Sequence, residues 1–239
     1  MDFERFQRRW SITAAAEART STTWATIYGL TCHAHELVRS GFLRVDPGSI
    51  STAPIARSVF EAGVTAQWLR WQPDADLALL RKRRREQLKL TEDLQSSPLE
   101  GQRAAGARRR QSHVEPEIPR TSVQEPDTSF RAICMTFEQG TELYVYYRVL
   151  CGQMHAGVEA AETWLEVDEK GELHVRRTPK EVGRLAWPYL TLLGVLWASR
   201  ALDDVIRPST RGNFLNRVAK DAKLPAAGYE TRTRLTPRR

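Results

Sequence analysis

The chain has 239 residues, 41% of them hydrophobic, so it can bury the core of one large domain. Its formal net charge is +7 and its pI is about 9.6. This balance favours an anionic partner, with RNA, DNA or a membrane surface as the usual candidates, although basic helical surfaces give the same charge.

The cysteines and the apolar runs exclude further classes of protein. Cys32, Cys134 and Cys151 have no paired spacing, so we expect neither a disulfide framework nor a structural zinc site. The first residues are charged and lead into no apolar run, and the most apolar stretch, 185–199, is short and contains Pro188. We therefore expect no signal peptide, no membrane association and a cytoplasmic location.

Two amphipathic helices are predicted in the first part of the chain. Apolar residues at helical spacing indicate one over residues 3–17 and another over residues 21–40. His33 and His35 lie on the second helix, two positions apart, so they face different sides and cannot chelate one metal ion. We interpret both as ordinary helix residues.

A third helix, over residues 51–69, carries the first candidate site residues. Pro54 in its first turn suits a helix N-terminus, and apolar residues follow at helical spacing. Arg57 and Glu61 lie one turn apart beside the apolar stripe. They form either an ordinary ion pair on the helix or an orienting pair at the edge of a buried polar site.

The next region is strongly basic. A helix over residues 74–93 carries five consecutive cations, which either face solvent or follow a phosphate backbone. Residues 96–129 form a long irregular loop or insertion, of which a part between Pro98 and Gln111 is helical. The candidate nucleic-acid-binding residues of this region are Arg81, Lys82, Arg83, Arg84, Arg85, Arg108, Arg109 and Arg110.

A helix over residues 142–162, preceded by a short one over 130–137, carries Arg148 and His155. Seven residues turn a helix through about 20° less than two full turns, so these side chains share one face, about 10 Å apart. A bound phosphodiester could touch both, and Gly152 between them would let it approach closely. The predicted core contacts of this helix are Leu143, Tyr146, Val149, Leu150 and Met154.

The remaining patterns complete an all-α fold. Alternating residues around a glycine turn indicate a β-hairpin insertion over about 163–177. A very apolar helix over residues 180–206 is expected at the centre of the bundle or at an interface, and one more helix over 213–223. We predict one helical-bundle domain, residues 1–208, followed by a basic C-terminal extension, residues 209–239.

The spacing of Arg148 and His155 resembles the Arg-x(4–6)-His motif of the HEPN superfamily (higher eukaryotes and prokaryotes nucleotide-binding). Members of that superfamily are helical bundles, and many are metal-independent ribonucleases in toxin, anti-phage and RNA-processing systems. The resemblance covers one helix and the all-α character. It implies that the chain is an endoribonuclease that acts as a toxin or an anti-phage effector.

A second resemblance covers more of the chain. The stretches 54–62 and 147–155 are similar to a bacterial helical family of unknown function, whose members share an Arg-x3-Glu helix and a Tyr...His helix. Together the two resemblances imply that two helices pack against each other and bring four polar residues into one constellation: Arg57, Glu61, Arg148 and His155.

These residue types suit RNA cleavage without a metal ion or another cofactor. RNA supplies its own nucleophile, the 2′-OH. His155 would act as general base or acid, Arg148 would hold the phosphate, and Glu61 would orient Arg57 or His155. Because one imidazole does not easily serve both proton transfers, a homodimer that pairs two His155 side chains is attractive.

Three other interpretations of the same residues remain open. The chain could be a non-catalytic helical module that binds nucleic acid or a protein partner, with the four residues as a buried structural network. It could bind a small anion or nucleotide without chemistry, or it could be another enzyme. A reactive site requires Arg148 and His155 at the wall of an open cleft, whereas a structural network would bury them.

Overall fold

A computed structural model describes residues 22–46, 49–112, 122–123, 128–154, 157–180, 186–206 and 211–225. The predicted helix over residues 3–17 and the predicted loop residues 113–121 lie outside this range. Within it, the fold is helical apart from one two-stranded hairpin, which confirms the predicted all-α bundle with a hairpin insertion.

The chain divides into two compact units, which are described separately. Unit 1 comprises Met1–Trp71 and Phe130–Arg239, and unit 2 comprises Gln72–Ser129. The helices and strands of unit 1 are α2 (Thr22–Ser40), η1 (Phe42–Arg44), η2 (Ile50–Thr52), α3 (Ala53–Trp71), α6 (Phe130–Met135), α7 (Gly140–Gly152), α8 (Val158–Glu162), β1 (Leu165–Val167), β2 (Leu173–Val175), α9 (Ala186–Ile206) and α10 (Gly212–Asp221). Unit 2 holds α4 (Ala75–Gln95) and α5 (Glu100–Ser112).

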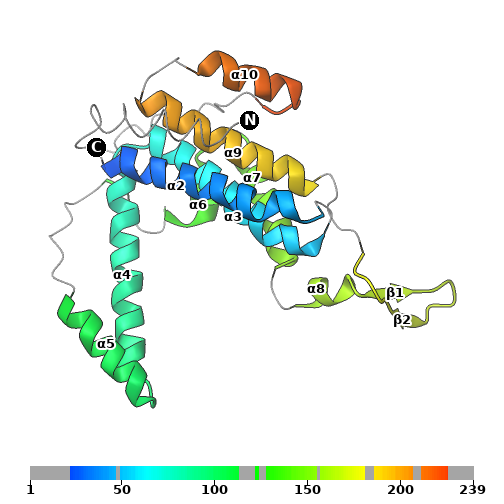
Figure 1. Cartoon of the computed structure of the whole chain (residues 1–239), viewed down its shortest axis with the longest axis horizontal. Helices are drawn as coiled ribbons and strands as arrows, with labels where there is room; N and C mark the ends of the chain where they lie inside the picture. The colour runs from blue at the N-terminus through cyan, green and yellow to red at the C-terminus, as the bar shows by residue number, and fades with distance from the viewer. Residues whose placement is uncertain are drawn as a thin grey trace. The chain divides into compact units, whose positions relative to one another are not determined.

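The core of unit 1 lies between α2, α3 and α9, which lie side by side (Figure 1). Most residues of α3 are buried, as expected for a helix that is apolar on nearly every side. The largest buried side chains include Trp68 on α3 with Trp187 and Trp197 on α9. The apolar helix predicted over residues 180–206 is therefore central to the bundle.

Two glycines allow α3 and α9 to approach closely. A Cβ atom at Gly63 would collide with the carbonyl oxygen of Gly194, and one at Gly194 would collide with the carbonyl oxygen of Val59. Because backbone atoms of the facing helix occupy the space of a side chain, only glycine fits at either position.

Buried polar groups also tie the three central helices together. The Gln67 amide donates to the Trp197 carbonyl oxygen at 2.8 Å. The Thr31 hydroxyl donates to the Ala198 carbonyl oxygen at 3.1 Å. His35, which is 5% exposed, forms a hydrogen bond of 3.0 Å between its Nε2 atom and the Ser199 hydroxyl. These bonds link buried polar groups of α2 and α3 to α9, and the Thr31 hydroxyl also lies 2.8 Å from the Ile27 carbonyl oxygen of its own helix.

The second half of α9 also anchors α10. Asp204 pairs with Arg70 on α3 at 2.5 Å and with Arg200 on its own helix at 3.4 Å. Arg200 donates in turn to the Asn216 side chain on α10 at 3.1 Å. The helix predicted over residues 213–223 is thus confirmed as α10.

The prediction of one continuous helix over residues 142–162 is wrong. α7 ends at Gly152, and the short helix α8 begins only at Val158. Gly157, just before α8, has an extended backbone (φ −136°, ψ −173°). Glycine destabilises a helix interior by about 1 kcal/mol relative to alanine, so two glycines five positions apart favour the break.

The predicted hairpin follows α8. β1 and β2 pair antiparallel, with Leu165 opposite Val175 and Val167 opposite Leu173. Gly171 in the turn has a positive φ of 82°, a conformation that other residues rarely adopt. Figure 1 shows the hairpin extending beyond α8.

Unit 2 is built on two polar helices. α4 and α5 pack against each other, and Gly106 on α5 lies against Leu94 and Gln95 on α4. Within the segment 96–129, which was predicted as largely irregular, α5 corresponds to the part expected to be helical. Among the helices described in either unit, none combines the length and apolarity needed to span a membrane.

Candidate functional site

Arg57 and Glu61 lie at the contact between α3 and α7, as the sequence predicted for the two helices. Glu61 Oε1 accepts hydrogen bonds from Arg57 Nε at 3.3 Å and from Arg57 Nη2 at 3.2 Å. Their side chains are 20% and 32% exposed, so the pair is partly shielded from water. The pair therefore orients a guanidinium at the edge of the core rather than on an open surface.

The same guanidinium bridges to the region of α7. Its Nη2 donates to the Tyr147 hydroxyl at 3.0 Å, and its Nη1 lies 3.7 Å from the Met154 sulfur. Its Cζ atom is 5.0 Å from the centre of the Tyr147 ring. We call Arg57, Glu61, Tyr147 and Met154 the Arg57 network.

Aromatic rings support one side of the Arg57 network. The ring centres of Tyr147 and Phe130 are 4.5 Å apart, and those of Tyr147 and Tyr144 are 6.0 Å apart. Phe130 continues the contact to Phe60 in the core at 6.2 Å. These rings fix the orientation of Tyr147 and hence the position of its hydroxyl.

The protonation states within the network follow from burial and from the Glu61 charge. Burial raises the pKa of Tyr147 to about 12, with further increases from its hydrogen bond to Cys151 and from Glu61. Burial and Glu61 also raise the pKa of the Cys134 thiol to about 12. Burial lowers the pKa of Arg57, but Glu61, Cys151 and Tyr147 raise it by more. At neutral pH the Tyr147 phenol is thus neutral and the Arg57 guanidinium keeps its charge.

The two motif residues stand differently in the structure. Arg148 is exposed on α7, about 100° around the helix from Tyr147. His155, three positions after the end of α7, lies outside the described residues, and so does Ala156. The prediction that both side chains share one face of a continuous helix is therefore wrong, because that helix ends at Gly152.

The buried face of α7 also differs from the prediction. Leu143 and Leu150 are buried as expected, but Tyr146 is 39% exposed and Val149 is 51% exposed. Tyr147, and not Tyr146, faces α3. The aromatic contact of Tyr147 with Phe130 and its hydrogen bond from Arg57 lie on that side. Sequence reasoning missed Tyr147 as a site residue, because Tyr146 and Tyr147 both lie one helical turn from Leu143 and from Leu150, and the spacing does not distinguish them.

The predicted nucleic-acid-binding residues belong to unit 2. Arg83, Arg85 and Arg108 are exposed, and Lys82 donates to the Thr128 carbonyl oxygen at 3.3 Å. The half-buried members of the set are Arg81, Lys82, Arg84 and Arg109, and the side chain of Arg110 lies outside the described residues. The set thus combines exposed cations on α4 and α5 with cations that make contacts within the protein.

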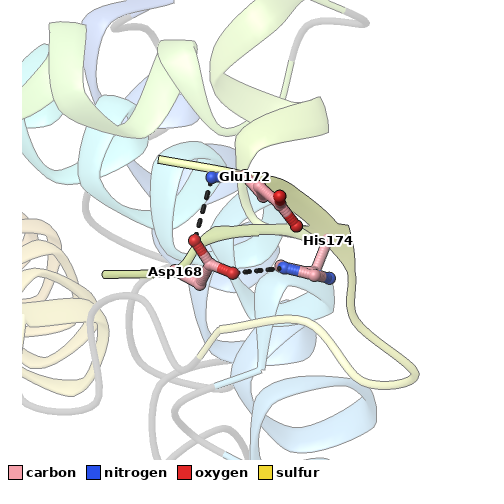
Figure 2. Close-up of side chains that lie close together, drawn as sticks. All are labelled: Asp168, Glu172 and His174. Carbon is pink, nitrogen blue, oxygen red and sulfur yellow. Dashed lines mark hydrogen bonds and ion pairs between the residues drawn. The ribbon is translucent and has the colours of Figure 1, made fainter. Parts of the chain in front are cut away.

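A third group of polar residues lies on the hairpin, where the ligand-type atoms of Asp168, Glu172 and His174 are within 4.8 Å of one another (Figure 2). Asp168 Oδ1 accepts hydrogen bonds from the backbone of Lys170 and Glu172, each at 2.9 Å, and Oδ2 pairs with His174 Nε2 at 2.9 Å. The bond to His174, followed by these backbone bonds, lowers the pKa of Asp168. These hydrogen bonds stabilise the hairpin turn, and they explain why the three side chains lie close together.

The comparisons with known proteins assign no family. No protein-family model, no curated protein and no solved structure matches this chain. The residues of the α3–α7 contact are therefore the basis for the function proposed below.

Proposed function

We propose that this chain is a metal-independent endoribonuclease of the HEPN type, with Arg148 and His155 as its catalytic residues. The observation that supports the proposal most directly is the reach of Arg57. Its guanidinium contacts Tyr147 and Met154, which immediately precede Arg148 and His155 in the chain. The Arg57 guanidinium on α3 thus contacts the residue directly before Arg148 and the residue directly before His155.

The chemistry needs only groups that RNA and this chain supply. His155 removes the proton of a ribose 2′-OH, whose oxygen attacks the adjacent phosphorus. The bond to the 5′ oxygen breaks, which leaves a 2′,3′-cyclic phosphate and, after proton transfer to that oxygen, a 5′-hydroxyl end. Arg148 neutralises the phosphate charge that builds up during attack. A second His155 in a homodimer would supply the proton of the leaving group.

The other charged residues have supporting roles in this proposal. Glu61 holds the Arg57 guanidinium, which adds a positive charge close to the motif. The exposed cations on α4 and α5 hold the RNA backbone. We place the enzyme in the cytoplasm, where its substrate is and where its cysteines stay reduced, and we propose a role as a toxin or an anti-phage effector.

The Arg57 network also favours a second candidate, a non-catalytic module that binds nucleic acid or a protein partner. Arg57 is engaged by Glu61, Tyr147 and Met154, as expected of a residue that fixes helix packing. Under this reading the network stabilises the fold, and only the exposed basic residues act on a partner. One observation counts against this second candidate. It expects Arg148 in a buried network, whereas Arg148 is exposed.

The deciding experiment measures RNA cleavage by the purified full chain in the presence of EDTA. The proposal predicts cleavage of RNA to products with 2′,3′-cyclic phosphate ends, and no cleavage of DNA or of RNA methylated at every 2′-OH. His155→Ala and Arg148→Ala should each reduce the rate at least ~100-fold.

Two matched variants serve as controls. His33→Ala removes an exposed histidine from α2, and Arg217→Ala removes an exposed arginine from α10. Both should cleave RNA at the wild-type rate. RNA binding without cleavage by a folded wild-type chain would instead support the non-catalytic module, and full activity of folded His155→Ala would refute the proposed role of His155.

A further inference from the structure

Tyr144 and Arg148 lie on one face of α7. They are one helical turn apart and about 40° from each other around the helix axis. Side chains on a helix lean towards its N-terminus, so the exposed Arg148 side chain leans towards the turn that holds the half-buried Tyr144. An aromatic ring beside a cation is a combination that binds nucleotides, since the ring stacks on a base and the cation pairs with a phosphate.

A second cation approaches the same ring from α6. The Cζ atom of Arg131 is 5.9 Å from the centre of the Tyr144 ring, near the outer limit of a cation–π contact. Arg131 is exposed, as is Arg148. In the part of the chain that the structure describes, neither of them is paired with a carboxylate, in contrast to Arg57 with Glu61. Two exposed guanidinium groups thus flank the Tyr144 ring.

The protein holds the Tyr144 ring in place. The ring stacks on Tyr147, with ring centres 6.0 Å apart and an angle of 27° between the planes. Tyr147 is fixed in turn by the Phe130 ring at 4.5 Å and by a hydrogen bond of 3.0 Å from Arg57. A ring that is oriented before binding loses little freedom when a base stacks on it. The Arg57 network therefore also prepares Tyr144 for a ligand.

The combination of one ring and two cations favours unpaired RNA over other anionic ligands. A free phosphate or an acidic peptide would use the cations but not the ring. In a duplex the bases stack on one another, so their faces do not reach an aromatic side chain. An unpaired nucleotide within a chain offers one open base and a phosphate on either side of it, which matches all three groups.

We propose that Tyr144, Arg131 and Arg148 form a subsite for one unpaired nucleotide of an RNA substrate. The base stacks on Tyr144, and the two phosphates that flank it pair with Arg131 and Arg148. This inference rests on the proposed function, since it places a base of the substrate next to the phosphate that Arg148 neutralises. It restricts that substrate to single-stranded RNA.

The test measures binding of the full chain to a short, labelled single-stranded RNA by fluorescence anisotropy. Every 2′-OH of this RNA is methylated, so cleavage through that group is blocked and binding is measured whether or not the chain is a ribonuclease. Tyr144→Leu removes the ring but keeps an apolar side chain, and the dissociation constant should rise roughly tenfold, as expected for one lost stacking contact. Tyr144→Phe keeps the ring and should bind like wild type.

Two comparisons separate stacking from a loss of structure. Tyr146 is 39% exposed and lies about 160° around α7 from Tyr144, so Tyr146→Leu is a matched control that should bind like wild type. An oligomer with the same backbone but without bases should bind equally well to wild type and to Tyr144→Leu. Arg131→Gln should weaken the binding of both oligomers and lower the steepness of the salt dependence by about 0.7, the value for one phosphate contact.

The results also distinguish this subsite from the ribonuclease itself. Wild-type binding by folded Tyr144→Leu would refute the subsite, and so would an equal loss of binding with the oligomer that lacks bases. Base-dependent binding without cleavage of unmodified RNA would refute the ribonuclease and leave the subsite standing. Cleavage of single-stranded RNA that does not depend on Tyr144 would refute the subsite alone.

Discussion

The charged guanidinium of Arg57 lies in the half-buried contact between α3 and α7. Hydrogen bonds to a charged group typically contribute about 1.5–3 kcal/mol, and Arg57 makes such bonds to Glu61 and to Tyr147. Because the pKa of Tyr147 is raised to about 12, the phenol stays neutral and can accept the bond from Arg57 at any physiological pH. The phenol thus remains an acceptor for the guanidinium, which Glu61 holds from the other helix.

His35 is the residue whose protonation should couple stability to pH. Burial lowers its pKa from 6.5 to about 4, so the unfolded chain binds the proton more readily than the folded one. The neutral side chain therefore supports the fold fully above about pH 6.5. As the pH falls from about 6.5 to about 4, the free energy of unfolding should decrease by about 3 kcal/mol through this residue.

Urea unfolding of wild type and His35→Gln between pH 7.5 and 4 isolates this contribution. The glutamine can keep a hydrogen bond to Ser199 but does not titrate, so the stability difference between the two proteins should shrink or reverse towards low pH. His33→Ala, at an exposed position of the same helix, should follow wild type. Parallel curves for wild type and His35→Gln would contradict the buried neutral state of His35.

Among the helices, the crossing of α3 and α9 is the contact with the least room. In Gly194→Ala the new methyl group would press against the backbone of Val59 and Phe60, and the two helices would have to move apart. Overpacking of this kind typically costs 1–3 kcal/mol, and we expect about 3 kcal/mol here because the obstacle is backbone. Thermal and urea unfolding measure the loss.

A glycine on the neighbouring helix provides a control of opposite sign. Gly29 is exposed within α2, and a Cβ atom there would meet no atom within 4 Å. Gly29→Ala should therefore stabilise the protein by about 0.5–1 kcal/mol through helix propensity. If Gly194→Ala were as stable as Gly29→Ala, α3 and α9 would not cross at the glycines.

At the scale of elements, the apolar periodicity was sufficient to predict most helices and the hairpin. α2, α3, α4 and α10 fall within a few residues of their predicted ranges, because each has a clear apolar pattern or flanking signals. The same apolar periodicity did not predict the break within the helix expected over residues 142–162. Helices tolerate single glycines, and only the structure shows that the chain leaves the helix after Gly152.

The candidate site could be predicted only in part. The spacing of Arg57 and Glu61 indicated their pairing, which the structure confirms. The partner on α7 is Tyr147, and neighbouring tyrosines at 144, 146 and 147 gave no way to choose between them from composition alone. The choice depends on the rotation of α7 about its axis, which its contacts with α3 and α6 determine.

At the scale of the whole molecule, both units carry basic side chains. The exposed cations Arg83 and Arg108 lie in unit 2, while the Arg57 network lies in unit 1. If unit 2 holds the RNA backbone, RNA binding should weaken with salt, with a slope of log K against log salt of about −0.7 for each phosphate contact. Arg83→Ala/Arg108→Ala should lower the steepness of that slope by about 1.4, since each arginine is expected to contact one phosphate.

Fluorescence anisotropy with labelled single-stranded RNA measures this slope directly in the His155→Ala background, in which the proposed mechanism predicts no cleavage. The same double change should leave the cleavage step of bound RNA unaffected in the wild-type background, because neither arginine belongs to the Arg57 network. Arg39→Ala, which removes an exposed arginine already paired with Glu36 at 3.0 Å, should keep the full slope. An unchanged slope in Arg83→Ala/Arg108→Ala would show that RNA binds elsewhere, and the basic charge of α4 would then be left for contacts with protein.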